Sequence, residues 1–204
     1  MNKILQLIIQ FTFLVLFIIL TLIGKVHLWM GLFAMGVIAS IWFGRIYCGW
    51  ICPINTAMGF ITFIKTRLHI KSTTIPSYLS RTLVRYIALT VFIAVFLFTV
   101  VTGRQLPVLP ILLISGVLIT LIFPSELWHY SLCPFGTILA FSSRLSRHYM
   151  RINSDKCIHC GLCFQVCPAK AVNKKEGSYR IIKNDCLVCM NCSRKCPKNA
   201  ITYQ

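Results

Sequence analysis

The sequence predicts an α-helical membrane domain followed by a small, cysteine-rich α+β domain. Three observations support this fold class. Of the 204 residues, 57% are hydrophobic although the formal net charge is +17, which is unusual for a soluble domain. Apolar runs of membrane-spanning type recur up to Phe123, and a regular pattern of cysteines extends from Cys157 to Cys196. We therefore expect residues 1–151 to form a transmembrane domain and residues 152–204 a cytoplasmic one.

The first two apolar runs predict a helical hairpin. Ile4 to Ile23 is interrupted only by glutamine and threonine, and such a run gives about 30 Å of helix, enough for one bilayer crossing. We expect this span to be retained, because no small-residue cleavage site follows it. Leu28 to Phe43 predicts a second, shorter span after a turn at Gly24-Lys25.

Two further runs predict a second hairpin. Tyr86 to Thr102 is a third span, and Ile111 to Phe123 is a fourth that is short unless it begins near Leu106. Six of the lysines and arginines lie between residues 45 and 85 and twelve lie beyond residue 143. Basic residues near span ends collect on the cytoplasmic side. Four transmembrane helices with both termini inside a prokaryotic cytoplasmic membrane fit this distribution.

Two cytoplasmic loops, residues 44–83 and 124–151, carry related Cys-Pro motifs. The first contains Cys52-Pro53-Ile-Asn-Thr56 and the second Cys133-Pro134-Phe-Gly-Thr137, so the membrane half is predicted to be a duplication. Proline fits the first turn of a helix. After Pro53 we expect an amphipathic helix along the inner membrane face, with its apolar positions at Ala57, Phe60, Ile61, Ile64 and Leu68.

The C-terminal domain contains the same cysteine pattern twice. Three cysteines at steps of three, then a fourth followed by proline, are typical of a ferredoxin with two [4Fe–4S] clusters, in which the fourth cysteine binds the neighbouring cluster. Zinc sites or disulfides are the alternatives. The pattern predicts Cys157, Cys160, Cys163 and Cys196 as ligands of cluster 1, and Cys186, Cys189, Cys192 and Cys167 as ligands of cluster 2.

The two halves of this domain are predicted at residues 152–177 and 178–204. Their cysteine patterns repeat at an offset that brings Cys157 onto Cys186. Tyr179 to Ile182 and Ala200 to Tyr203 are the segments that best fit short strands.

A second set of metal-ligating residue types lies beside the membrane spans. Cys48 and Cys52 would share one face if their segment is helical, and the second copy supplies His129 and Cys133 at the same register. These residues suit a third metal centre, either a cluster with an unusual ligand or copper. They also suit a redox-active thiol pair, or inert packing.

The remaining polar residues give weaker indications. The basic residues flank apolar spans and form no single stripe, so no nucleic-acid partner is expected. His27, Trp29 and Arg104 at the predicted outer surface are candidates for a quinone pocket, although tryptophan is also common at membrane interfaces. Proton handling at a quinone would fall to His129, Glu126, Tyr130 or water, because the chain has only four acidic residues.

The motif Gly44-Arg45-Ile-Tyr-Cys48-Gly-Trp-Ile-Cys52-Pro53, its partial repeat at Cys133-Pro134 and the double cysteine run together resemble the membrane polyferredoxins of the NapH, NosR and CcoG type. The order of elements is most similar to the NapH-like quinol dehydrogenase membrane component. That resemblance implies electron transfer between the quinone pool and a partner redox protein. The chain departs from the pattern at His129, where the family has cysteine, and we expect no domain for the flavin of NosR.

We therefore expect a multi-pass iron–sulfur protein that anchors two cytoplasmic [4Fe–4S] clusters to the lipid bilayer and exchanges electrons with quinone and a partner. No acid–base or nucleophile constellation is visible, so any role as an oxidoreductase subunit rests on electron transfer alone. The alternatives are a copper-handling or assembly factor for a membrane oxidase, and a membrane anchor that recruits soluble redox enzymes.

Overall fold

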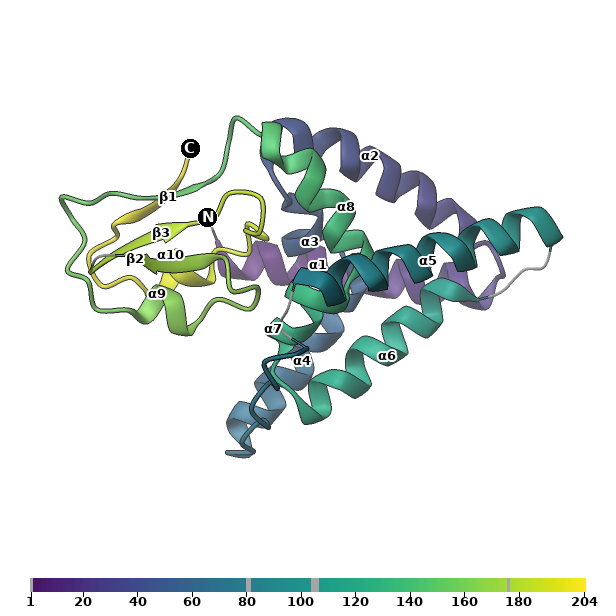
Figure 1. Ribbon diagram of the computed structural model, residues 1–204, viewed down its shortest axis with the longest axis horizontal. Helices are drawn as coiled ribbons and strands as arrows, with labels where there is room; N and C mark the ends of the chain where they lie inside the picture. The colour runs from purple at the N-terminus through teal and green to yellow at the C-terminus, as the bar shows by residue number, and fades with distance from the viewer. Residues whose placement is uncertain (1, 80–81, 104–106, 176) are drawn as a thin grey trace. The chain divides into compact units, whose positions relative to one another are not determined.

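A computed structural model describes residues 2–79, 82–103, 107–175 and 177–204 (Figure 1). The chain forms two compact units. Unit 1 comprises residues 1–30 and 52–137, and unit 2 comprises residues 31–51 and 138–204. The segment between the predicted first hairpin and its Cys-Pro motif thus groups with the C-terminal residues. The domain boundary predicted at residue 151 differs from the division between these two units. It stays a prediction.

The four predicted apolar segments all form helices. They are α1 (Lys3–Leu22), α2 (His27–Phe43), α5 (Thr82–Thr102) and α6 (Val108–Ile122). In the described residues, α1 and α5 have the length and composition to cross a membrane, whereas α2 and α6 are shorter apolar helices. The extension of the fourth span toward Leu106 lies outside the described residues. Four spans and their orientation stay a prediction.

The duplication inferred from the Cys-Pro motifs is visible in the order of elements. After α2, the chain forms α3 (Ile46–Trp50), breaks at Cys52 and continues as α4 (Pro53–Arg67). After α6, it forms α7 (Ser125–Leu127) and the π-helix η1 (Trp128–Leu132), breaks at Cys133 and continues as α8 (Pro134–Ser142). A one-turn 3-10 helix, η2 (Ser143–Leu145), follows. Each copy therefore places its Cys-Pro motif between a short helix and a longer one.

Equivalent hydrogen bonds fix the two Cys-Pro junctions. The Thr56 hydroxyl donates to the Cys52 carbonyl at 3.2 Å, and the Thr137 hydroxyl donates to the Cys133 carbonyl at 3.1 Å. Both cysteines have extended backbone geometry, because a following proline disfavours the helical region for the residue before it. The repeated sequence thus produces a repeated backbone break.

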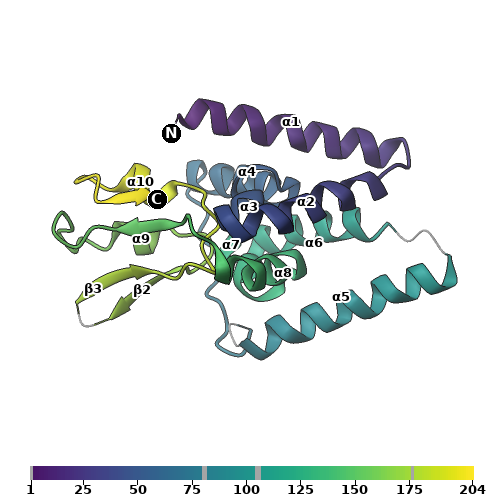
Figure 2. The same ribbon diagram turned by 90° about the horizontal axis from the view of Figure 1, so that it is seen from above.

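Within unit 1, helix α4 packs against α1 and α6, and Figure 2 shows it between them. Ile54 and Met58 of α4 are buried against α6. Gly116 of α6 allows this approach, because a Cβ atom there would lie 2.9 Å from the Ile54 Cγ2 atom and 3.2 Å from the Trp128 ring. The close contact between these helices therefore depends on glycine.

A lysine caps the end of α6. Lys65 is buried, and its ammonium donates to the carbonyls of Thr120 and Leu121 at 3.0 and 3.1 Å. The Thr73 N–H donates to the Ile122 carbonyl at 3.0 Å. The last turn of a helix has carbonyls without intrahelical partners and a partial negative charge, so a lysine there satisfies both.

The helix predicted after Pro53 is present, and it packs on the protein through a face that the prediction did not name. Ile54, Met58 and Lys65 face the protein, while Phe60 is 53% exposed and Leu68 is 64% exposed. Hydrophobic spacing alone cannot decide this, because a helix beside lipid can direct one apolar face to protein and another to the membrane. Phe60 is thus available to a membrane surface.

The C-terminal residues of unit 2 contain two small antiparallel sheets. β1 (Met150–Ile152) pairs with β4 (Ile201–Tyr203), and β2 (Val172–Lys175) pairs with β3 (Ser178–Ile181). Two short helices, α9 (Leu162–Gln165) and α10 (Asn191–Lys195), pack on each other. The strands predicted at Tyr179–Ile182 and Ala200–Tyr203 are confirmed to within one residue. Buried cysteines form much of the core, together with Met150, Ala171, Val172, Val188, Met190 and Ile201.

We predict that Gly116→Val destabilises unit 1 by about 1–3 kcal/mol, the usual cost of overpacking a core. Thermal unfolding of the purified protein in detergent, followed by circular dichroism, would measure the loss. Gly59→Val is the matched control, because no atom lies within 4 Å of the Cβ position at this helical glycine. Equal transition temperatures for the two variants would contradict the packing described here.

Candidate iron–sulfur sites

The two halves of the C-terminal domain have the same unusual backbone conformations at equivalent positions. Positive φ angles occur at His159, Gly161 and Lys170 in the first half. They recur in the second half at Val188, Met190 and Asn199. Such conformations turn successive N–H groups to one side, which suits a negatively charged group.

Val188 is the most unfavourable of these residues. A β-branched side chain rarely adopts a positive φ, yet Val188 has φ 54° and is 1% exposed. Met190, at φ 60°, occupies the position that glycine fills in the first half. Strain of this kind persists only where the surroundings hold it. The second cysteine loop is therefore held in a fixed shape.

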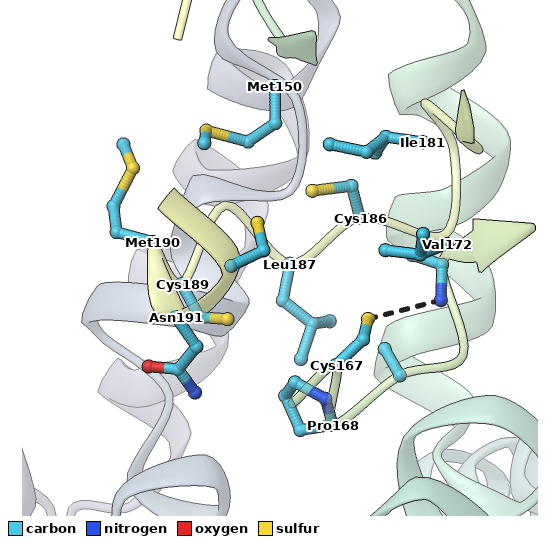
Figure 3. A pocket seen from close by; sticks show the side chains of 13 residues that line it. Met150, Cys167, Pro168, Val172, Ile181, Cys186, Leu187, Cys189, Met190 and Asn191 are labelled. Carbon is cyan, nitrogen blue, oxygen red and sulfur yellow. Dashed lines mark hydrogen bonds between the residues drawn. The ribbon is translucent and has the colours of Figure 1, made fainter. Parts of the chain in front are cut away.

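A cavity beside this loop gathers the cysteines predicted for cluster 2. Figure 3 shows the sulfur atoms of Cys167, Cys186 and Cys189 turned toward the same space. Cys167 belongs to the first half and the other two to the second, so the lining crosses between the halves as the ligand pattern predicts. All four predicted ligands line the cavity: Cys167, Cys186, Cys189 and Cys192.

Each Cys-Pro cysteine of this domain accepts a backbone hydrogen bond through its sulfur. The Ala171 N–H donates to Cys167 Sγ at 3.3 Å, and the Ala200 N–H donates to Cys196 Sγ at 3.4 Å. The two bonds are equivalent in the two halves. Hydrogen bonds to the sulfurs are among the features that set the potential of an iron–sulfur cluster.

The cavity disfavours bare thiolates. Burial raises the pKa of Cys189 to about 11 and that of Cys192 to about 12, and burial also raises the pKa of Cys186. The charges of neighbouring thiolates, including Cys167, raise these pKa values further, while backbone N–H groups such as that of Val188 lower them. A positively charged core bound by the sulfurs would remove this conflict. The residues present therefore fit an iron–sulfur cluster.

The cysteines predicted for cluster 1 are more accessible. Burial, with added contributions from nearby Cys157 and Cys160, raises the pKa of Cys163. Cys160 is exposed, and Ile158 in the same loop is 54% exposed. The structure thus brings Cys157, Cys160 and Cys163 together, and the participation of Cys196 stays a prediction.

A contact that the sequence did not predict lies within unit 2, between α3 and the second cysteine loop. The Trp50 Nε1–H donates to the Val188 carbonyl at 3.1 Å. A Cβ atom at Gly49 would overlap the Leu187 carbonyl and lie 3.1 Å from the Cys189 N atom, so only glycine allows this approach. The sequence signal was Gly49-Trp50 directly after Cys48.

Arg45 also lies in this contact. It is 1% exposed, and its guanidinium donates to the Asp185 carbonyl at 3.3 Å and to Cys48 Sγ at 3.8 Å. Asp185 directly precedes Cys186, the first predicted ligand of cluster 2. Three residues of the motif first noted for its cysteines therefore contact the loop from residue 185 to residue 189.

The membrane-side set is divided between the two units. Cys48 lies in unit 2, whereas Cys52, His129 and Cys133 lie in unit 1, and all four are buried. The prediction that Cys48 and Cys52 share a helical face is wrong. Helix α3 ends at Trp50 and Cys52 is extended, because Pro53 disfavours the helical conformation at Cys52.

A preformed site for one metal ion is absent from the residues that the structure describes. None of their histidine, cysteine, aspartate and glutamate side chains gather in a group of three or more around one position. This includes the eight C-terminal cysteines, as expected for a cubane, because its four thiolates bind four different irons. None of the eleven cysteines forms a disulfide. A third metal centre stays a prediction.

The residues considered for a quinone pocket have different surroundings. Trp29 is 2% exposed and packs edge-on against Phe13 and Phe17 of α1, with ring centroids 6.3 and 5.1 Å away. Helix packing thus accounts for this tryptophan. His27 is exposed at the start of α2, and Arg104 lies outside the described residues.

Comparisons with known families agree with this organisation. A family described as "4Fe-4S dicluster domain" matches residues 150–203. A second family, described as "4Fe-4S binding domain", matches twice, at residues 26–71 and 105–153. These two matches contain the two Cys-Pro motifs and support the duplication. No solved structure matches the chain.

Several curated proteins are similar to this chain. Putative electron transport protein YccM of Escherichia coli is 26% identical over 66% of the chain and 44% of its own length. MauN of Methylobacillus flagellatus, a methylamine utilization ferredoxin-type protein, is 28% identical over 65% and 52%. The ferredoxin-type protein NapH of Haemophilus influenzae is 26% identical over 69% and 55%. The chain spans about half the length of these relatives.

The chain therefore carries ferredoxin-type 4Fe–4S domains. The three relatives named above are two ferredoxin-type proteins and a putative electron transport protein, consistent with a NapH-like polyferredoxin.

We predict that Trp50→Phe destabilises unit 2 by roughly 1–3 kcal/mol, because it removes the donor to a buried carbonyl at Val188. Chemical denaturation of the cluster-loaded protein in detergent, followed by loss of visible cluster absorbance, would measure this. Trp42→Phe is the control, since Trp42 is 46% exposed. If both variants lose absorbance at the denaturant concentration of the native protein, the Trp50 contact has no role in stability.

Proposed function

We propose that this protein is a membrane-bound electron-transfer protein with two [4Fe–4S] clusters. One observation carries the proposal: the cavity lined by Cys186, Cys189 and Cys192 of one half and Cys167 of the other. This crossed arrangement is what a two-cluster ferredoxin requires. By the repeat, Cys157, Cys160, Cys163 and Cys196 would hold the other cluster.

The protein residues would bind the clusters and adjust their properties. The cysteine sulfurs would bind iron, and the N–H groups of Ala171 and Ala200 would stabilise negative charge on sulfur. Buried apolar residues such as Val172 and Ile201 would limit access of water. When bound, each cluster supplies a centre that accepts and releases one electron.

Membrane attachment is supported by the exposure of the apolar helices. In α5, the apolar stretch of 18 residues has a mean hydropathy of 2.4, and 0% of it is buried. In α1, the corresponding stretch has a mean hydropathy of 2.5, and 11% of it is buried. A core helix of a soluble protein would be mostly buried, and exposed apolar surface of this extent needs lipid or a partner. We propose that the apolar helices span a prokaryotic cytoplasmic membrane four times and that the ferredoxin domain faces the cytoplasm.

We further propose that the clusters exchange electrons with quinone and with a partner redox protein. The NapH and MauN relatives are named ferredoxin-type proteins, and an electron carrier needs both a donor and an acceptor. A quinone would connect the clusters to the lipid phase, and Cys52, His129 and Cys133 in unit 1 and Cys48 in unit 2 are each a separate candidate for contact with it. Cys48 is the member of this set that lies in the same unit as cluster 2.

The second candidate role for the membrane-side residues is a third cluster. The family that matches both Cys-Pro regions is a 4Fe–4S binding domain, which favours iron over copper at this position. His129 would then replace a cysteine ligand. A copper-handling role has no such support from the family matches.

We predict about eight irons per chain in the purified protein, and about twelve if the membrane-side set also binds a cubane. Cys167→Ser and Cys186→Ser should each weaken the same cluster and leave the other intact, although these residues lie in different halves. Iron analysis with EPR of the reduced protein would measure this. If Cys167→Ser instead altered the signal that Cys157→Ser alters, the crossed assignment would be wrong. Ser154→Ala, at an exposed position of the same domain, is a control without a thiol change.

We predict that a menaquinone analogue oxidises the reduced clusters in membranes or detergent. Recovery of the visible cluster absorbance after mixing, under anaerobic conditions, would measure the transfer. Glu126→Gln tests proton handling, with Asp155→Asn in the C-terminal domain as the control carboxylate. Absence of transfer in the fully loaded protein would rule out the quinone role and leave the cluster assignment unaffected.

A further inference from the structure

The two cysteine loops of the ferredoxin domain have equivalent backbones but different neighbours. Leu187 in the second loop is 2% exposed, whereas Ile158, its equivalent in the first loop, is 54% exposed. The segment from Gly44 to Trp50 covers the second loop. This cover comes from the Cys-Pro region of the chain and not from the ferredoxin repeat. Two sites with the same ligands thus have different surroundings.

Arg45 places a positive charge within this cover. Its guanidinium contacts the carbonyl of Asp185, the residue next to Cys186. Arginine keeps its charge at all pH values of interest. At 1% exposure the charge is poorly screened by water, so it acts on nearby groups more strongly than a surface charge would.

The position of Arg45 is fixed by the contacts on either side of it. Gly49 lies against the backbone at Leu187, and the Trp50 side chain is bonded to the Val188 carbonyl. Gly44 itself has a positive φ of 66°, and a Cβ atom there would lie 3.3 Å from the His148 carbonyl and 3.6 Å from Val188. A flexible arginine would spread its charge over many positions, whereas this one is held beside one loop.

We propose that Arg45 raises the reduction potential of the cluster held by Cys186, Cys189, Cys192 and Cys167, and so makes it different from the cluster held by Cys157, Cys160, Cys163 and Cys196. This inference rests on the proposed cluster ligands. Reduction adds one negative charge to a cluster, and a fixed positive charge nearby stabilises the reduced form. Arg45 is a positioning and tuning residue, since it is not among the proposed ligands.

This difference gives the two clusters surroundings that differ in charge and in access to solvent. The second cluster would lie under the Gly44–Trp50 cover, close to Cys48, while the loop of the first cluster is open to solvent at Ile158 and Cys160. Arg45 acts on the covered cluster.

The test is an EPR-monitored redox titration of the cluster-loaded full chain in detergent, with the iron content of each variant measured first. Arg45→Gln removes the charge and keeps hydrogen-bond donors. We expect it to shift the potential of one cluster to a more negative value and to leave the other unchanged. Arg45→Lys keeps the charge, and both potentials should stay near those of the native protein.

Two controls show which cluster undergoes the shift in potential and that the shift comes from Arg45. Arg180→Gln removes one exposed positive charge from the same unit and should change neither potential, because water and salt screen it. In a Cys160→Ser background, which perturbs cluster 1, the remaining cluster should still shift when Arg45 is replaced by glutamine. If it does not, the affected cluster is the wrong one and the proposal fails.

The outcomes separate this inference from the proposed function. Fewer than about eight irons in the native protein would overturn the cluster assignment, and the inference with it. Full iron content with unchanged potentials in Arg45→Gln would overturn the inference alone. So would equal shifts in the glutamine and lysine variants, because the effect would then come from packing and not from charge. If Arg45→Gln fails to retain iron, an Arg45→Lys protein with a clearly lowered potential in one cluster would also overturn it.

Discussion

The C-terminal domain depends on a positive charge that offsets the negative charge of its buried cysteine thiolates. Burial raises the pKa values of Cys186, Cys189 and Cys192, so the fold by itself opposes the thiolates that iron requires. Two small sheets and two short helices offer little other core. In the proposed arrangement, bound iron supplies the positive charge and joins both halves, as Cys167 faces the cysteines of the other half. Binding and folding are then coupled.

Much of the fold could be predicted from the sequence because its signals are local. Apolar runs gave the helices, and the strands around Tyr179 and Ile201 were correct to within one residue. The face that α4 buries could not be predicted. Lys65 lies on it because the carbonyls that end α6 need donors, and this requirement belongs to a helix far along the chain.

Some features of the candidate site could likewise be predicted from the sequence, and others could not. Cysteine spacing alone assigned Cys167 to the ligand set of the other half, and Cys167 lines one cavity with Cys186, Cys189 and Cys192. The contacts of Arg45, Gly49 and Trp50 could not be predicted, because they join residues about 140 positions apart in the sequence. The error at Cys52 has a local cause that was present in the sequence, namely the following proline.

The chain contains two duplications, one in the ferredoxin domain and one in the Cys-Pro regions. A contact between residues of the two repeats makes the surroundings of the two cysteine loops different. The ferredoxin repeat alone would make two equivalent sites, since even the positive φ angles recur in pairs. The repeat of the Cys-Pro motif also has two copies, but their sequences diverge at the short helix, with Gly49-Trp50 in one and Tyr130-Ser131 in the other. Only a glycine permits the close approach to the Leu187 carbonyl. The copy with Gly49 therefore contacts the second cysteine loop, where Leu187 is 2% exposed, while Ile158 in the first loop is 54% exposed.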